Sequence, residues 1–261
     1  MKKEIDRHTS FYDAALAYDG QLGFPSPERI STDPDTRFYV EEALGTSGAV
    51  LELGCGTGRI TFALADAGLT VVGLDSSEEM IRVAKAKLKP DSVLSVRFAH
   101  GDMREFSIDD RFSRIYIPFN AVHHLYSSTD IRRCLQSVRR HFSSDGRLVF
   151  DCLNPSVRFL ANPRHNFVKT REYQDARTGG IVTISEKNIY DAESQILENE
   201  FLYDYGERAC KYRVDKRIWF PQELDAHLHY NGFTVIAKYG DFDRSAFKSE
   251  SPKQIVMCEL A

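Results

Sequence analysis

Residues 50–59 read VLELGCGTGR, and this stretch decides the fold of the chain. An apolar run carries the acidic Glu52 near its end, and glycines follow at the alternate positions Gly54, Gly56 and Gly58. Because glycine has no Cβ, the backbone can turn sharply there and can approach a ligand closely. A helical pattern begins after the last glycine. The stretch therefore predicts a buried strand, a glycine turn and the start of a helix.

A second apolar run, Val71–Leu74, ends in Asp75. This is the distance along the chain at which such folds place a ribose-binding carboxylate, which can accept hydrogen bonds from both ribose hydroxyls. The spacing of the glycines argues against a dinucleotide, because Arg59 stands where the third glycine of G-x-G-x-x-G belongs. No P-loop lysine follows the turn either. We therefore expect a site for another cofactor that contains adenosine.

Strand and helix patterns alternate on both sides of this stretch. Strands are predicted near residues 49–53, 70–74, 93–99, 113–118, 147–152, 233–239 and 254–260, with helices between most of them. Such alternation implies parallel strands joined by right-handed crossovers. The closing pair of strands matches an antiparallel hairpin. The fold class predicted is α/β, with a doubly wound, mostly parallel sheet of seven strands.

A block of different character interrupts this alternation. Apolar and polar residues alternate with the strand period over residues 166–174, 181–190, 196–205 and 211–220, and turn residues separate these segments. The pattern predicts an antiparallel meander in which each strand has one wet face. Its apolar face must cover something, and the mouth of the active site and a second subunit are the two candidates.

The composition limits the partners of the chain. Its 261 residues carry a formal net charge of −4, so no strong basic field attracts nucleic acid. No apolar run approaches the roughly 18–20 residues that span a bilayer, and no signal segment is visible at the N-terminus. The five cysteines show no C-x-x-C pair, so we expect reduced thiols and no metal site. These features predict a cytoplasmic protein that acts without nucleic acid or membrane.

The string ELGCGTGR resembles the first motif of class I S-adenosylmethionine-dependent methyltransferases. The segments Asp151–Pro155 and Tyr239–Asp243 are similar to those of a bacterial branch that methylates small molecules, including amines. Several members of that branch carry a β-sheet insertion at this place, and the similarity covers most of the chain. The resemblance implies a Rossmann-like fold, S-adenosyl-L-methionine as the cofactor and S-adenosyl-L-homocysteine as the product.

The resemblance also implies a division of the chain and a set of cofactor-binding residues. Residues 1–36 would form an N-terminal lid helix and loop, 37–164 and 221–261 the cofactor-binding core, and 165–220 the inserted sheet, as substrate cover or dimer interface. The segment Gly101–Met103 would frame the adenine, and Pro118–Phe119 would separate cofactor from acceptor. The expected cofactor-binding residues are Glu52, Gly54, Cys55, Gly56, Gly58, Asp75, Ser76, Met80, Gly101, Asp102, Met103, Pro118, Phe119 and Tyr39.

Four residues are candidates for the catalytic step: Asn120, His123, His124 and Tyr18. An amine acceptor must lose its proton before it attacks a methyl group, and histidine, with a pKa near 6.5, is suited to take it. Tyr18 would lie on the lid. Structural roles remain open for all of them, since neighbouring histidines can cap or pack against a helix and a tyrosine can anchor one.

The predicted function is methyl transfer to a small-molecule or peptide acceptor, with an amine nitrogen preferred. Two alternatives stay open at this point. One is a cofactor-binding scaffold or sensor without catalysis, whose inserted sheet mediates assembly. The other is a nicotinamide-dependent oxidoreductase, which the glycine spacing disfavours. The chain would act as a monomer or a homodimer.

Overall fold

The computed structural model describes residues 5–7, 19, 33–89, 95–175 and 178–261. Within these residues the larger of two sheets has seven strands in the order β12-β13-β6-β5-β2-β3-β4. Strand β13 runs antiparallel to both of its neighbours, and the other strand pairs are parallel. The predicted α/β class with a mostly parallel sheet is confirmed. The strands are β2 (Ala49–Leu53), β3 (Val71–Asp75), β4 (Val96–His100), β5 (Phe112–Ile117), β6 (Phe142–Leu153), β12 (Phe233–Tyr239) and β13 (Lys253–Leu260).

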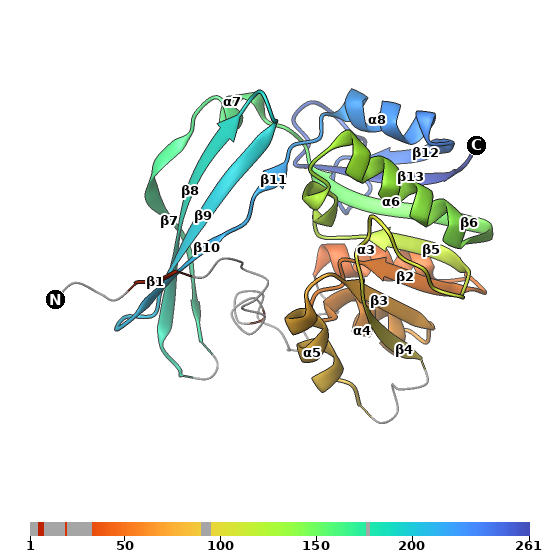
Figure 1. Cartoon of the computed structure of the whole chain (residues 1–261), viewed down its shortest axis with the longest axis horizontal. Helices are drawn as coiled ribbons and strands as arrows, with labels where there is room; N and C mark the ends of the chain where they lie inside the picture. Colours follow the sequence, from red (N-terminus) through yellow and green to blue (C-terminus); the bar gives the residue numbers. More distant parts are fainter. Residues whose placement is uncertain (1–4, 8–18, 20–32, 90–94, 176–177) are drawn as a thin grey trace.

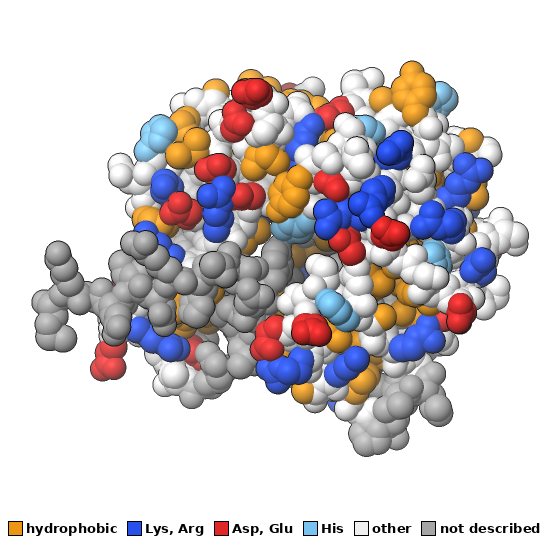
Figure 2. Space-filling model, viewed as in Figure 1, with side chains coloured by type: hydrophobic (Ala, Val, Ile, Leu, Met, Phe, Trp, Pro, Cys, Tyr) orange, Lys and Arg blue, Asp and Glu red, His pale blue; other side chains and the backbone are white. Residues whose placement is uncertain are grey.

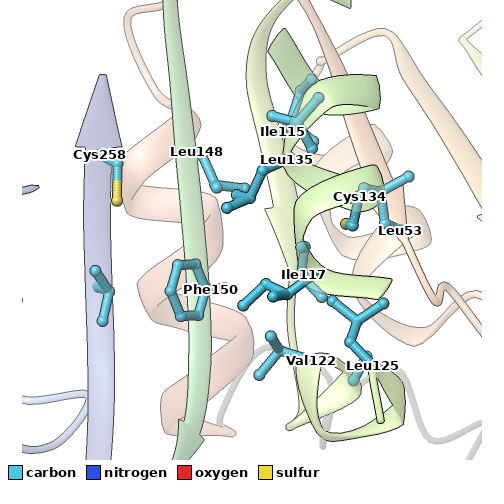
Figure 3. Close-up of a cluster of buried hydrophobic side chains, with 14 of the residues drawn as sticks. Leu53, Ile115, Ile117, Val122, Leu125, Cys134, Leu135, Leu148, Phe150 and Cys258 are labelled. Atoms are coloured by element: carbon cyan, nitrogen blue, oxygen red, sulfur yellow. The ribbon is translucent and has the colours of Figure 1, made fainter. Parts of the chain in front are cut away.

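Helices cover both faces of this sheet, as doubly wound folds require. One face packs against α3 (Pro34–Ala43) and α4 (Arg59–Asp66), through a buried cluster that includes Phe38, Ile60 and Leu64. The other face packs against α6 (Ser128–His141) and α8 (Pro221–Tyr230). Figure 3 shows part of this second cluster, in which Cys134 and Leu135 of α6 lie against side chains of the strands. Helix α5 (Glu78–Ala86) packs on β3 and β4.

Capping side chains fix where two of these helices begin. Ser127 accepts a hydrogen bond from the Asp130 N–H, and the Asp130 carboxylate accepts one from the Ser127 N–H, which forms a capping box at α6. Helix α5 is capped by Ser77, whose hydroxyl accepts from the Met80 N–H. These bonds satisfy backbone donors that a helix leaves unpaired at its N-terminus.

The second sheet lies beside the first (Figure 1). Its central strands form the expected meander, and their apolar face gathers Val182, Ile184, Tyr203 and Tyr212 in a separate buried cluster. The last predicted strand, 211–220, is interrupted after Arg213 and resumes at Lys216 in the same register against β9. The strands are β1 (Ile5–Arg7), β7 (Arg164–Gln174), β8 (Ile181–Asp191), β9 (Ile196–Asp204), β10 (Ala209–Arg213) and β11 (Lys216–Arg217).

Strand β1 differs from the sequence-based expectation of a helix over the first residues. Ile5–Arg7 pair in parallel with Ala209–Lys211 of β10 and extend the edge of the second sheet. Most of the predicted lid, including Tyr18, lies outside the described residues. Among the described helices, none is both long and apolar enough to cross a bilayer.

Candidate active site

The glycine turn after β2 forms the floor of the site. Gly54, Gly56 and Gly58 have φ angles of 74°, 56° and 92°, a region that side-chain-bearing residues rarely adopt. A Cβ on Gly54 would lie 3.0 Å from the Cβ of Ala121, and one on Gly58 would lie 2.7 Å from the Phe62 ring. Side chains are therefore excluded from the turn by its conformation and by its neighbours. Gly54 and Gly56 line the cavity described below.

Asp75 lies at the end of β3, directly beside this turn. Its Oδ2 accepts a hydrogen bond of 2.7 Å from the Gly56 N–H, and its Oδ1 accepts one of 2.9 Å from the Ser77 N–H. Burial raises the pKa of this carboxyl, against the lowering effect of the backbone N–H groups of Ser77, Gly56 and Ser76. Each oxygen uses one lone pair for the backbone and retains another for a ligand. Ser76 and Met80 line the cavity next to it.

Two of the predicted cofactor-binding residues lie beneath the turn rather than in the cavity wall. Glu52 is buried and accepts a hydrogen bond from the Thr61 hydroxyl. Its burial raises the pKa of the carboxyl to about 8. Cys55 is buried as well, with its sulfur on the side of Gly73. Both residues, like Gly58, support the turn from below, and none of the three is among the residues that line the cavity.

Thr57 in the turn has a partner that the sequence did not predict. Asp19 is buried and accepts a hydrogen bond of 2.5 Å from the Thr57 hydroxyl. Lys87 pairs with the same carboxylate at 2.7 Å and donates to the Thr57 carbonyl at 3.2 Å. These contacts tie Asp19 to the glycine turn and to the end of α5.

The loop after β4 contributes a second wall. Gly101, Asp102 and Met103, the segment expected from the resemblance to frame the adenine, line the cavity. The Arg104 guanidinium forms an ion pair with Asp102 at 2.5 Å and holds the pKa of that carboxyl below its usual range. Arg104 also reaches Asp130 at 3.3 Å. The ion pair fixes the Asp102 side chain at the edge of the cavity.

Strand β5 ends in a strained turn at Phe119 and Asn120, whose φ angles are 54° and 63°. A residue other than glycine costs about 1–3 kcal/mol when its φ is positive, and two in succession persist only when surrounding contacts stabilise them. The buried carboxylate of Asp151 does so, since it accepts the Phe119 N–H at 2.7 Å and the Asn120 N–H at 3.3 Å. The turn presents Pro118, Phe119 and Asn120 to the cavity.

Two further groups complete this network around Asp151. The Tyr39 hydroxyl donates to it at 2.9 Å, and the Lys253 ammonium pairs with it at 2.9 Å. Lys253 also donates to Oδ1 of Asn120 at 2.9 Å, which fixes the orientation of that amide. Tyr39 is fully buried and is not among the lining residues, so it can affect the cavity only indirectly, through its hydrogen bond to Asp151. Sequence reasoning assigned no site role to Asp151 or Lys253.

The structure separates the two neighbouring histidines, which lie in the short 3-10 helix η3 (Ala121–His124). His123 is buried, with Nδ1 2.5 Å from the Arg217 carbonyl and Nε2 accepting the Leu153 N–H at 3.0 Å. Burial lowers the pKa of His123 to about 3. His124 lines the cavity, with Nδ1 3.3 Å from the Tyr126 hydroxyl, and burial lowers its pKa to about 4. Both imidazoles are therefore neutral at pH 7.

These walls enclose one cavity of about 470 Å³, to which both sheets contribute. Figure 2 shows the hollow between the two halves of the molecule, with apolar and histidine side chains at its margin. On the core side lie the glycine turn, Asp75 and the loops after β4 and β5. The inserted residues 165–220 contribute Arg171, Phe201, Tyr203, Val214 and Lys216, for which no individual site role was predicted from the sequence.

Comparison with known proteins shows which family of enzymes this chain belongs to. A family profile described as "Methyltransferase domain" matches residues 50–146. The putative methyltransferase YqeM of Bacillus subtilis (strain 168) is 35% identical over 229 residues, which cover 84% of this chain and 90% of that protein. The chain belongs to the class I S-adenosylmethionine-dependent methyltransferases. Family membership decides against nicotinamide chemistry.

Other relatives agree with this assignment. The methyltransferase is 36% identical over 103 residues to dTDP-3-amino-3,6-dideoxy-alpha-D-glucopyranose N,N-dimethyltransferase of Streptomyces fradiae, covering 40% of this chain and 38% of that protein. The CcbJ methyltransferase of Streptomyces caelestis superposes with a TM-score of 0.80 at 25% identity, over 97% of this chain and 98% of that one. The glycopeptide N-methyltransferase MtfA, solved with S-adenosyl-L-methionine, shares the fold with a TM-score of 0.60 at 23% identity, over 87% of this chain and 93% of that one.

The residues of the cavity fit S-adenosylmethionine, the cofactor of this methyltransferase. The Gly54 and Gly56 backbone gives an open surface on which an amino-acid tail can lie, since no Cβ projects there. The Asp75 carboxylate retains acceptors for two ribose hydroxyls. Met103 offers an apolar side chain for the adenine, next to Asp102, whose carboxylate accepts from Arg104. The absence of a phosphate on this ligand agrees with a glycine turn that carries no lysine.

Proposed function

We propose that this methyltransferase transfers a methyl group from S-adenosylmethionine to an amine nitrogen of a small molecule or a peptide. The observation that carries the proposal is the neutral imidazole of His124 in the cavity wall, next to the strained turn after β5. The printed activities of two relatives support it, since one dimethylates an amino sugar and another methylates the nitrogen of a glycopeptide.

When bound, the cofactor supplies an electrophilic methyl carbon, so the task of the chain is to align a lone pair with it. Alignment of this kind is worth about 7–11 kcal/mol in favourable model systems. The neutral imidazole of His124 can accept a hydrogen bond from an N–H of the acceptor and so orient its nitrogen. With a pKa of about 4, it serves better as a hydrogen-bond acceptor than as a store for the proton.

We also propose that residues 165–220 cover the acceptor. Phe201 and Tyr203 extend from β9 to the cavity and would exclude water from the side opposite the glycine turn. An apolar, aromatic wall strengthens the electrostatic interactions inside the cavity and favours the spread of positive charge during transfer. The alternative use of this sheet, as a dimer interface, remains compatible with its outer face.

The test uses S-adenosylmethionine with a trideuterated methyl group and two panels of acceptors. One panel holds primary and secondary amines, among them amino sugars and short peptides, and the other holds the matching alcohols. Mass spectrometry then reports which molecules gain the labelled methyl. We expect labelled N-methyl products. Transfer to the alcohols with none to the amines would contradict the proposal.

A pair of variants tests the part of His124. His124→Ala should lower the maximal rate by about a hundredfold, because the acceptor nitrogen is then no longer oriented toward the methyl carbon. His165→Ala is the matched control, because His165 lies on β7 and is exposed. Calorimetry with S-adenosylhomocysteine should give the same affinity for both variants. An unchanged rate in His124→Ala at saturating acceptor would remove this residue from the mechanism.

A further inference from the structure

The two sides of the cavity differ in their charged side chains. The core side contributes the carboxylates of Asp75 and Asp102 and the guanidinium of Arg104, which pairs with Asp102. The inserted sheet contributes two cationic side chains, Arg171 and Lys216, and of the lining residues described on that side none carries a carboxylate. The Asp75 carboxylate matches the ribose hydroxyls of the cofactor. The side with Arg171 and Lys216 faces the space that remains for the acceptor.

Strand register places both cations on the same face of the inserted sheet. Arg171 pairs with Ile184, which pairs with Tyr203, so these three side chains share a face. Lys216 pairs with Leu197 of the same β9 strand. Leu197 and Tyr203 are six positions apart in that strand, which is an even number, so their side chains point to the same side. The face that carries the aromatic cover thus carries both cations, together with Glu186, which pairs with Phe201 on the same face.

Lys216 is held in surroundings that disfavour its charge. Burial lowers the pKa of its ammonium, and the nearby cations of Lys253 and Arg171 lower it further, while Glu186 acts in the opposite direction. Within the described residues the Lys216 side chain makes no hydrogen bond or ion pair. A half-buried ammonium without a partner is costly, and an anion placed beside it removes that cost.

Asn120 adds a donor on the other side of the same space. Because the Lys253 ammonium can only donate, Oδ1 of Asn120 must face it, at 2.9 Å. The Nδ2 group, which can only donate, is then turned away from Lys253. Asn120 lines the cavity, so this donor supplements the two cations.

We propose that the acceptor carries an acid group, a carboxylate or a phosphate ester, which binds at Lys216 and Arg171. This proposal rests on the proposed function only in assigning the inserted-sheet side of the cavity to the acceptor. The acid group anchors one end of the acceptor below the aromatic cover, and the nitrogen to be methylated lies toward His124. The pair of cations therefore selects for anionic acceptors over neutral ones of the same shape.

Binding of three small probes to the protein saturated with S-adenosylhomocysteine tests this proposal without turnover. The probes are phenylacetate, phenyl phosphate and the uncharged phenylacetamide, measured by calorimetric titration. We expect at least one acid to bind about tenfold more tightly than the amide, a difference of ~1.4 kcal/mol. Tighter binding of phenylacetate indicates a carboxylate acceptor, and tighter binding of phenyl phosphate indicates a phosphate ester. Equal affinities, or no measurable binding of either acid, would overturn the proposal.

Variants assign the preference to its residues. Lys216→Met should reduce the affinity for the acid to that for the amide, whereas Lys216→Arg should retain the preference. Lys187→Met is the matched control, because Lys187 pairs with Glu200, whose even-numbered position in β9 puts both on the opposite face of the sheet. S-adenosylhomocysteine should bind all three variants equally, which shows that they are folded. An acid preference that survives in Lys216→Met would overturn the proposal.

The outcome is separable from that of the proposed function. An acid preference can be present when no amine is methylated, and N-methyl products can form when neutral and anionic probes bind alike. The binding titration and the labelled-methyl screen therefore fail independently.

Discussion

Replacing Asp151 with asparagine perturbs the buried network that holds the turn after β5. Each carboxylate oxygen accepts from two donors, Oδ1 from the Tyr39 hydroxyl and the Phe119 N–H, and Oδ2 from the Asn120 N–H and the Lys253 ammonium. The amide NH₂ of asparagine can accept from neither of the donors that it faces. Whichever way the amide is turned, two hydrogen bonds to the former carboxylate are lost.

The expected loss in the free energy of unfolding follows from these two hydrogen bonds. A hydrogen bond to a charged group contributes about 1.5–3 kcal/mol, so Asp151→Asn should lower the free energy of unfolding by about 3–6 kcal/mol. That range agrees with the cost of breaking a buried ion pair on one side, about 3–5 kcal/mol. At about 2–4 °C per kcal/mol for a chain of this size class, the Tm should fall by about 6–24 °C.

Thermal and denaturant unfolding measure this loss against a matched control. Asp225→Asn removes the same charge from an ion pair with Lys238, but the Asp225 side chain is 36% exposed, whereas that of Asp151 is 0% exposed. Exposed pairs contribute about 0–1 kcal/mol, so this control should change little. The double variant Asp151→Asn with Lys253→Met should be less unstable than the two single effects added together, because no ammonium is then left unpaired. An Asp151→Asn variant as stable as Asp225→Asn would refute the reasoning.

Three further predictions concern the groups around the turn. Burial raises the pKa of Glu52 to about 8 in the folded chain, above its ordinary value of 4.5. The free energy of unfolding should therefore fall as pH rises from about 4.5 to 8, by up to about 1.4 kcal/mol per pH unit. Glu52→Gln should remove this fall in denaturant titrations, and an unaltered slope would contradict burial of a neutral carboxyl. His123 should give the opposite pH dependence. Burial lowers its pKa from 6.5 to about 3, so the free energy of unfolding should fall as pH drops below about 6.5, and His123→Gln should remove much of that fall. Gly54→Ala should abolish measurable S-adenosylhomocysteine binding, because the new Cβ would lie 3.0 Å from Ala121 at a φ of 74°; normal binding would show that the turn can relax.

The residues expected to bind the cofactor could be grouped from the sequence because their signals are local. A glycine turn that ends one apolar run and a carboxylate that ends the next meet at the carboxyl edge of a parallel sheet, so Gly54, Gly56 and Asp75 could be placed together from spacing alone. Ser77 rather than Ser76 caps helix α5, and the Ser76 carbonyl lies 3.0 Å from Nε2 of the His100 ring.

The acceptor side depends on long-range register, which periodicity does not encode. Lys253 reaches Asp151 only because β13 runs antiparallel to β6 with Lys253 opposite Leu153, a pairing of residues far apart in the chain. Arg171 and Lys216 belong to strands that read as half-exposed, and charged residues there ordinarily face water. The segment Asp151–Pro155 did carry a signal, since it ends the fifth strand of the predicted sheet at the same edge as Asp75.

The most direct test of the account is a calorimetric titration of S-adenosylhomocysteine into the native chain and into Asp75→Asn. The Asp75 carboxylate accepts hydrogen bonds from the Gly56 and Ser77 N–H groups and retains lone pairs for the ribose hydroxyls. We expect one site per chain, with binding to the variant weaker by about 1–3 kcal/mol, which is about a 5- to 150-fold rise in Kd. An unchanged Kd in Asp75→Asn would show that the cofactor binds elsewhere and would contradict the assignment of this cavity.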